Sequence, residues 1–167
     1  HRTFQPIDAR WLTHLLGRLL DRYGRIEALF AEAMEPDDPH VGGAIQQFST
    51  ELLEMDPDRP DRLRKHLARP EAGSACKRLN MYLRWMVRPG PVDLGIWDAV
   101  RPTQLVVPLD VHAAGQARKL GILDRKSTDW KAALQVTRFC RRLAPEDPAR
   151  YDFALFGQGI AEAEGTA

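Results

Sequence analysis

The stretch SACKRLNMYLRWMVR, residues 74–88, indicates the fold class most directly, because its apolar and polar side chains fall on different faces of one helix. Four apolar residues recur at helical spacing, as on the buried side of an amphipathic helix. They are Leu79, Tyr82, Leu83 and Met86. The polar positions predict a second, basic face, which carries Lys77, Asn80, Arg84 and Arg88.

Helical periodicity continues on both sides of this stretch. It predicts a short helix near residues 63–67 and longer helices at about 8–24, 26–34, 41–55, 111–122, 128–143 and 147–164. Asp8 is the expected N-cap of the first helix and Gly24 its expected C-cap. Residues 103–109, TQLVVPL, predict a brief extended run, but no alternation is long enough for a sheet. The sequence therefore predicts an all-α fold.

The composition is that of a globular chain. With 167 residues and 44% apolar content, it is long enough to bury one core. No segment approaches the ~18 apolar residues of a membrane span, and the first residues lack the pattern of a signal peptide. Cys76 and Cys140 are too few for an iron–sulfur or zinc framework. We therefore expect a cytoplasmic protein with no metal site.

Charge is distributed unevenly along the chain. Residues 74–142 contain 13 Lys and Arg but 5 Asp and Glu, a net charge of +8, whereas the remainder has a net charge of −7. A basic middle segment is compatible with a surface that binds phosphates, and equally with helices whose arginines are solvated.

Lys77 differs from the other lysines in its position. It lies in the first turn of the 74–88 helix, where the helix dipole and the neighbouring Arg78 both disfavour another positive charge. A lysine that loses its proton can attack an electrophilic carbon. The alternative is a side chain that only extends from a helix end into solvent.

Asp110 directly precedes the helical pattern VHAAGQARKLGI and is predicted to be its N-cap. Taken alone, such an aspartate would only stabilise the helix, by ~1 kcal/mol. A carboxylate close to an amine can also stabilise developing positive charge or accept a proton, so the pair Lys77 and Asp110 suggests catalysis.

Two segments together carry a resemblance to a known superfamily. GSACK, residues 73–77, and VPLDVH, residues 107–112, resemble the helix-hairpin-helix DNA glycosylases, in which a lysine begins the helix after the hairpin and an aspartate caps a later helix. The wider segments resemble a bacterial family of that superfamily, and the lysine-to-aspartate spacing is closest to the archaeal 8-oxoguanine DNA glycosylases. The hairpin PEAGSAC, residues 70–76, has fewer glycines than the usual pattern, so we expect a degenerate hairpin.

The resemblance implies a monomeric base-excision repair enzyme that removes an oxidised purine such as 8-oxoguanine from double-stranded DNA. Lys77 would form a Schiff base with the sugar, assisted by Asp110, in a glycosylase and AP-lyase reaction that needs no cofactor. The chain would be one all-α unit, residues 1–167, from the C-terminal part of a longer, nucleoid-associated protein. Its helical lobe, 1–70, and its hairpin and catalytic region, 71–167, would flank a cleft.

Further residues receive roles on the same basis. Five basic side chains are expected to contact DNA phosphates. They are Arg84, Arg88, His112, Arg118 and Lys119. Asp152 and Phe156, four residues apart on the last predicted helix, are expected to recognise the extruded base, although Phe156 also suits a plain core position.

Two other kinds of protein remain compatible with the sequence. One is a non-catalytic nucleic-acid-binding helical module that keeps the hairpin and the basic face. The other is a protein-interaction bundle whose acidic ends form the working surface.

Overall fold

The computed structural model describes residues 3–155 and 157, and in this part of the chain it contains helices and no β-strand. The all-α prediction is therefore confirmed. The α-helices are α1 (Pro6–Tyr23), α2 (Ile26–Ala33), α3 (Gly42–Glu54), α4 (Lys77–Val87), α5 (Val111–Lys119) and α6 (Trp130–Leu143). Three short 3-10 helices accompany them, η1 (Asp61–Lys65), η2 (Pro102–Gln104) and η3 (Pro148–Tyr151).

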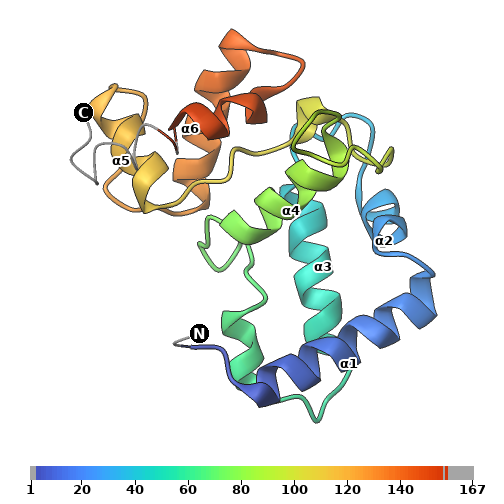
Figure 1. Cartoon of the computed structure of the whole chain (residues 1–167). Helices are drawn as coiled ribbons and strands as arrows, with labels where there is room; N and C mark the ends of the chain where they lie inside the picture. Colours follow the sequence, from blue (N-terminus) through green and yellow to red (C-terminus); the bar gives the residue numbers. More distant parts are fainter. Residues whose placement is uncertain (1–2, 156, 158–167) are drawn as a thin grey trace.

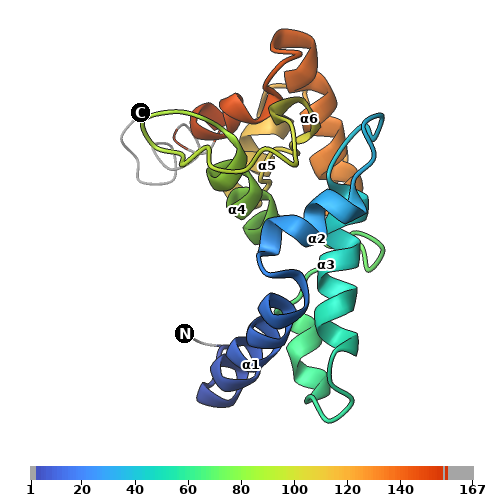
Figure 2. The same ribbon diagram turned by 90° about the vertical axis from the view of Figure 1, so that its right-hand side faces the viewer.

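The helices extend from one end of the molecule to the other. Helix α1 forms one end, where it packs against α2, α3 and η1 (Figure 1). Helix α3 rises from α1 towards α4, and α6 lies at the opposite end in both views (Figures 1 and 2). Helix α6 packs against η3. Helix α4 thus lies between the N-terminal helices and the C-terminal helices.

One hydrophobic core joins these parts. Phe30 of α2 contacts Phe48 of α3 and Trp97, with ring centroids 5.6 and 5.4 Å apart. Trp97 in turn meets Tyr82 of α4 edge to face at 5.4 Å. Such aromatic pairs add to the free energy gained by burying their apolar area. The aromatic cluster therefore fixes α4 against the N-terminal helices.

The sequence placed most helix ends correctly. Asp110 caps α5 and Gly24, with φ of 74°, ends α1, as predicted. Residues 105–109 are buried and neither helical nor paired as a strand. The prediction for Asp8 was wrong, because Pro6 starts the helix earlier and Gln5 is the N-cap. Asp8 instead accepts a hydrogen bond from the Gln5 backbone N–H at 2.9 Å.

Most of the predicted basic face of α4 does not lie on the surface, and Lys77 at its start is the partly exposed member. Asn80 is buried, and its side-chain amide donates to the Ala75 carbonyl at 3.0 Å. Arg84, four residues later, is 5% exposed. Both sides of α4 are therefore packed, one by aromatic rings and the other by polar groups. Within residues 3–155 and 157, no helix combines the length and the apolar character that crossing a membrane requires.

The aromatic cluster leads to a stability prediction. Phe30 is fully buried, so Phe30→Ala should lower the free energy of unfolding by about 3–5 kcal/mol through lost burial and the cavity left behind. Leu20→Ala, at a side chain 43% exposed on α1, should change it by less than about 1 kcal/mol. Urea unfolding followed by circular dichroism measures both, and equal effects would contradict the assignment of Phe30 to the core.

Candidate active site

Lys77 and Asp110 meet in space. The Lys77 Nζ lies 3.2 Å from Asp110 Oδ2, although 33 residues separate them in sequence. Lys77 is the first residue of α4 and Asp110 is the N-cap of α5, so the contact joins the starts of two helices. The side chains are 36% and 17% exposed. The two side chains therefore converge in space, and the amine remains partly accessible to solvent.

The two oxygens of Asp110 have different partners. Oδ1 accepts hydrogen bonds from the backbone N–H groups of His112 and Ala113, at 3.0 and 2.9 Å. Oδ2 faces Lys77. Burial raises the pKa of Asp110, but the hydrogen bond from Ala113 and the hydrogen bond and charge of Lys77 outweigh it, so this pKa lies below its ordinary value. Asp110 is therefore a carboxylate at neutral pH.

The turn before α4 sets the position of Lys77. Cys76 has a left-handed backbone with φ of 50°, and its N–H donates to the Ser74 hydroxyl at 3.1 Å. Ala75 and Cys76 are buried, which anchors the turn. Burial raises the pKa of the Cys76 thiol to about 11, so the neighbouring cysteine is a neutral thiol and not a competing nucleophile.

A cavity of about 140 Å³ lies beside the amine. Its lining combines three charged side chains, two aromatic rings and one methionine, from α4 and from the segment after η3. They are Lys77, Met81, Arg84, Trp85, Asp152 and Phe153. The Arg84 guanidinium lies over the Phe153 ring at 4.3 Å from its centroid. Trp85 and Phe153 are 40% and 47% exposed, so two aromatic rings border the opening.

The sequence analysis missed three of these residues. Met81 and Trp85 follow Lys77 by four and eight positions, which places them on the same side of the helix, so their spacing could have revealed them. Phe153 follows Asp152 directly and no periodic signal marks it. Hollows elsewhere, along α1 and beside α6, are larger, but those linings contain no lysine.

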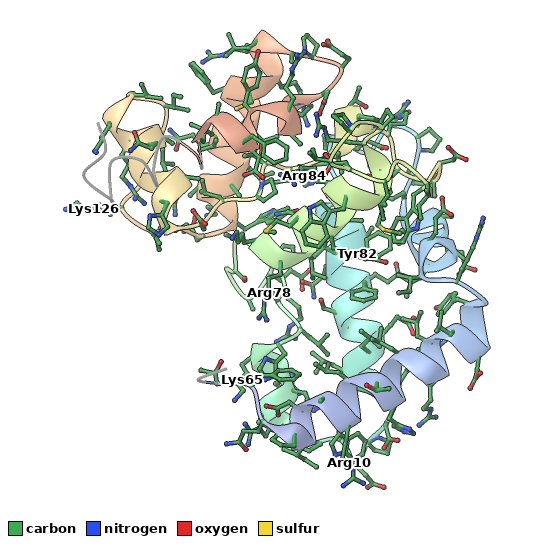
Figure 3. The ribbon with its side chains drawn as sticks, viewed as in Figure 1. Arg10, Lys65, Arg78, Tyr82, Arg84 and Lys126 are labelled. Carbon is green, nitrogen blue, oxygen red and sulfur yellow. The ribbon has the colours of Figure 1, made fainter. Side chains whose placement is uncertain are left out.

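Arg84 and Arg88 are not free to bind phosphates as expected. Arg84 pairs with Asp93 at 3.4 Å and closely with Asp152. Arg88 pairs with Asp93 and, at 2.9 Å, with Asp147. Figure 3 shows Arg84 between α4 and the C-terminal segment. Both guanidiniums therefore face carboxylates of the protein itself, and of the two only Arg84 lines the cavity.

The other expected phosphate contacts are dispersed. His112 is exposed near the start of α5, close to Asp110. Arg118 and Lys119 lie in the last turn of α5, roughly 10 Å further along the helix axis than His112. Arg118 donates to backbone carbonyls of the following loop. His112 is therefore the expected phosphate ligand that lies nearest to the Lys77–Asp110 pair.

Asp152, one of the two residues expected to recognise a base, lines the cavity. Burial raises its pKa to about 6, although the charges of Arg84 and Lys77 lower it. Phe156, the other residue, lies outside the described part of the chain. Within residues 3–155 and 157, no group of three or more His, Cys, Asp or Glu side chains has the geometry of a metal site.

Comparison with known proteins gives a family but no activity. The chain belongs to DUF2400, a family described as proteins of unknown function, whose family model matches residues 1–161. No curated protein and no solved structure matches the chain. The arrangement of side chains is therefore the basis on which a function can be argued.

The raised pKa of Asp152 predicts a specific pH dependence. The folded state holds this proton up to about pH 6, whereas the ordinary pKa is 3.8, so the stability that this proton contributes is lost as the pH rises between those values. The difference in unfolding free energy between the protein and its Asp152→Asn variant should change by about 2 kcal/mol from pH 4 to pH 7. If the unfolding free energies of the two proteins changed by the same amount over this pH range, the raised pKa of Asp152 would be contradicted.

Proposed function

We propose that this protein is a DNA base-excision repair glycosylase with associated AP-lyase activity, in which Lys77 is the nucleophile and Asp110 its carboxylate partner. The observation that carries the proposal is the 3.2 Å contact between Lys77 Nζ and Asp110 Oδ2, at the starts of two helices and beside a cavity. The resemblance of GSACK and VPLDVH to helix-hairpin-helix glycosylases supports the same pair. The proposal also includes two structural features of that superfamily: a helix-hairpin-helix, here degenerate, and a cleft between the two helical lobes.

The reaction divides naturally between the two side chains. The bond from the deoxyribose C1′ to the base breaks, and the base leaves with the electron pair. Positive charge develops at C1′, where the Asp110 carboxylate stabilises it. The neutral Lys77 amine then bonds to C1′, and opening of the sugar ring gives a Schiff base. Lys77 must first lose a proton, with Asp110 or water as the carrier, and the nucleobase that leaves as an anion takes up one proton, so that the step balances.

The size and the lining of the cavity support a nucleobase as the group that leaves the sugar. A volume of about 140 Å³ with two aromatic rings at its opening suits a flat heterocycle withdrawn from the duplex. Asp152 offers acceptor oxygens and Arg84 offers donors, and both kinds of group are needed at the edge of a purine. We propose an oxidised purine such as 8-oxoguanine as the substrate, with Asp152 accepting from it and with Phe156 and Phe153 as the candidate stacking rings.

The same contact also suits a second function. An ion pair between Lys77 and Asp110 fastens α4 to α5 whether or not the amine ever reacts. The alternative is therefore a non-catalytic nucleic-acid-binding module in which the pair is structural. Covalent trapping distinguishes the two, because a structural pair forms no bond with a sugar.

Lys77→Gln tests the nucleophile. An amide nitrogen is not nucleophilic, so borohydride should trap the unmodified protein on duplex DNA that contains 8-oxoguanine or an abasic site, but not this variant. Binding to DNA should change little, because the phosphate contacts remain. The matched control is Lys131→Gln, an exposed lysine on α6, which should still be trapped. An adduct that persists in Lys77→Gln would show that another amine reacts.

Asp110→Asn tests the carboxylate. Asn caps helices about as well as Asp, so α5 should stay folded and the melting temperature should change little. Base excision in single-turnover assays should slow by about two or more orders of magnitude, because one preorganised charge is lost. Excision at the normal rate, with the fold intact, would assign Asp110 a purely structural role.

A further inference from the structure

Arg118 acts as a brace for the loop between α5 and α6. Its Nε donates to the Arg125 carbonyl at 2.8 Å, and its Nη2 donates to the Lys126 carbonyl at the same distance. Nη2 also reaches the Ser127 carbonyl and the Thr128 hydroxyl, at 3.5 and 3.3 Å. One guanidinium therefore bonds to four consecutive residues. Only the forked geometry of arginine can satisfy so many acceptors at once.

The end of this loop is fastened to the turn that precedes Lys77. Asp129 pairs with Arg125 at 2.6 Å, caps α6 through the Ala132 N–H and forms an isolated antiparallel β-bridge with Ser74. The Trp130 N–H donates to the Gly73 carbonyl at 3.3 Å. The loop is therefore held beside the start of α4, on the side of the molecule where Lys77 meets Asp110.

Two exposed cations project from this region. Lys126 is exposed on the braced loop, and Arg78 is exposed next to Lys77. Figure 3 shows Lys126 at the outer edge of the molecule and Arg78 below the start of α4, on the side that faces the N-terminal helices. Within the described residues, neither side chain takes part in an ion pair, in contrast to Arg84 and Arg88. Asp124 and Glu71 are the exposed acids in the two segments.

We propose that residues 124–128, braced by Arg118, and Arg78 form a surface that binds the sugar-phosphate backbone of duplex DNA beside Lys77 and Asp110. This inference rests on the proposed function and names the groups that hold its substrate. Exposed cations on a rigid backbone lose little conformational entropy on binding, and each phosphate contact releases condensed counterions from DNA. Arg118 is a positioning residue, because its own donors are already bonded to the loop.

The test is the salt dependence of binding to an undamaged duplex, measured by fluorescence anisotropy. Lys126→Gln and Arg78→Gln should each reduce the slope of log affinity against log salt by about 0.9, and the double variant by about 1.8. Arg10→Gln is the matched control, because it removes an equal charge from an exposed side chain at the far end, on α1 (Figure 3). Its slope should equal that of the unmodified protein.

Arg118→Lys tests whether Arg118 acts through its hydrogen bonds to the loop or only through its positive charge. It keeps the net charge, but an ammonium cannot bond to all four acceptors of the loop. Affinity should fall about as much as in Lys126→Gln, while thermal unfolding checks that the fold persists. Affinity equal to that of the unmodified protein would overturn the bracing role.

Failure of this inference can be told from failure of the proposed function. If the unmodified protein does not bind the duplex, or if Lys126→Gln and Arg78→Gln keep its slope, the surface is wrong. Borohydride trapping on a single-stranded abasic oligonucleotide then reports on Lys77 independently. Slopes that change as expected without any trapping would support the surface and reject the glycosylase chemistry.

Discussion

Two guanidiniums and three carboxylates, enclosed together, hold the C-terminal half of the structure in place. Arg84 and Arg88 of α4 share Asp93, and each pairs with one further acid, Asp152 and Asp147 respectively. Removing one partner from a buried pair typically costs about 3–5 kcal/mol, because the remaining charge is desolvated without compensation. Burial raises the pKa of one of these acids, Asp152, to about 6, although the charge of Arg84 lowers it.

This network also determines what the cavity can contain. It brings Asp152 and Phe153 over α4, so that the lysine, a guanidinium, a carboxylate and two aromatic rings surround one space. The same pairing buries Arg84 and leaves the Arg88 side chain only 15% exposed. The proposed contacts with DNA therefore rely on cations outside the network, such as the exposed Lys126, and not on the basic periodicity of α4.

The sequence predicted the features that depend on local chemistry. The cap at Asp110, the C-cap at Gly24 and the all-α class follow from short-range rules, and the resemblance paired Lys77 with Asp110 before their contact was visible. The burial of Arg84 could not be predicted, because its partner Asp152 is 68 residues away and an arginine spacing does not reveal a distant acid. Asp8 was misjudged for a related reason, since its carboxylate contacts Arg62 and His66 of a distant segment.

The electrostatics of Asp110 favour one of its two possible chemical roles. A carboxylate whose pKa is lowered by two backbone N–H groups and an ammonium has little affinity for a proton, which makes it a weak general base near neutral pH. The same groups keep it ionised and oriented, with Oδ2 directed at the amine. In the proposed reaction Asp110 therefore acts chiefly as the counter-charge to the sugar cation.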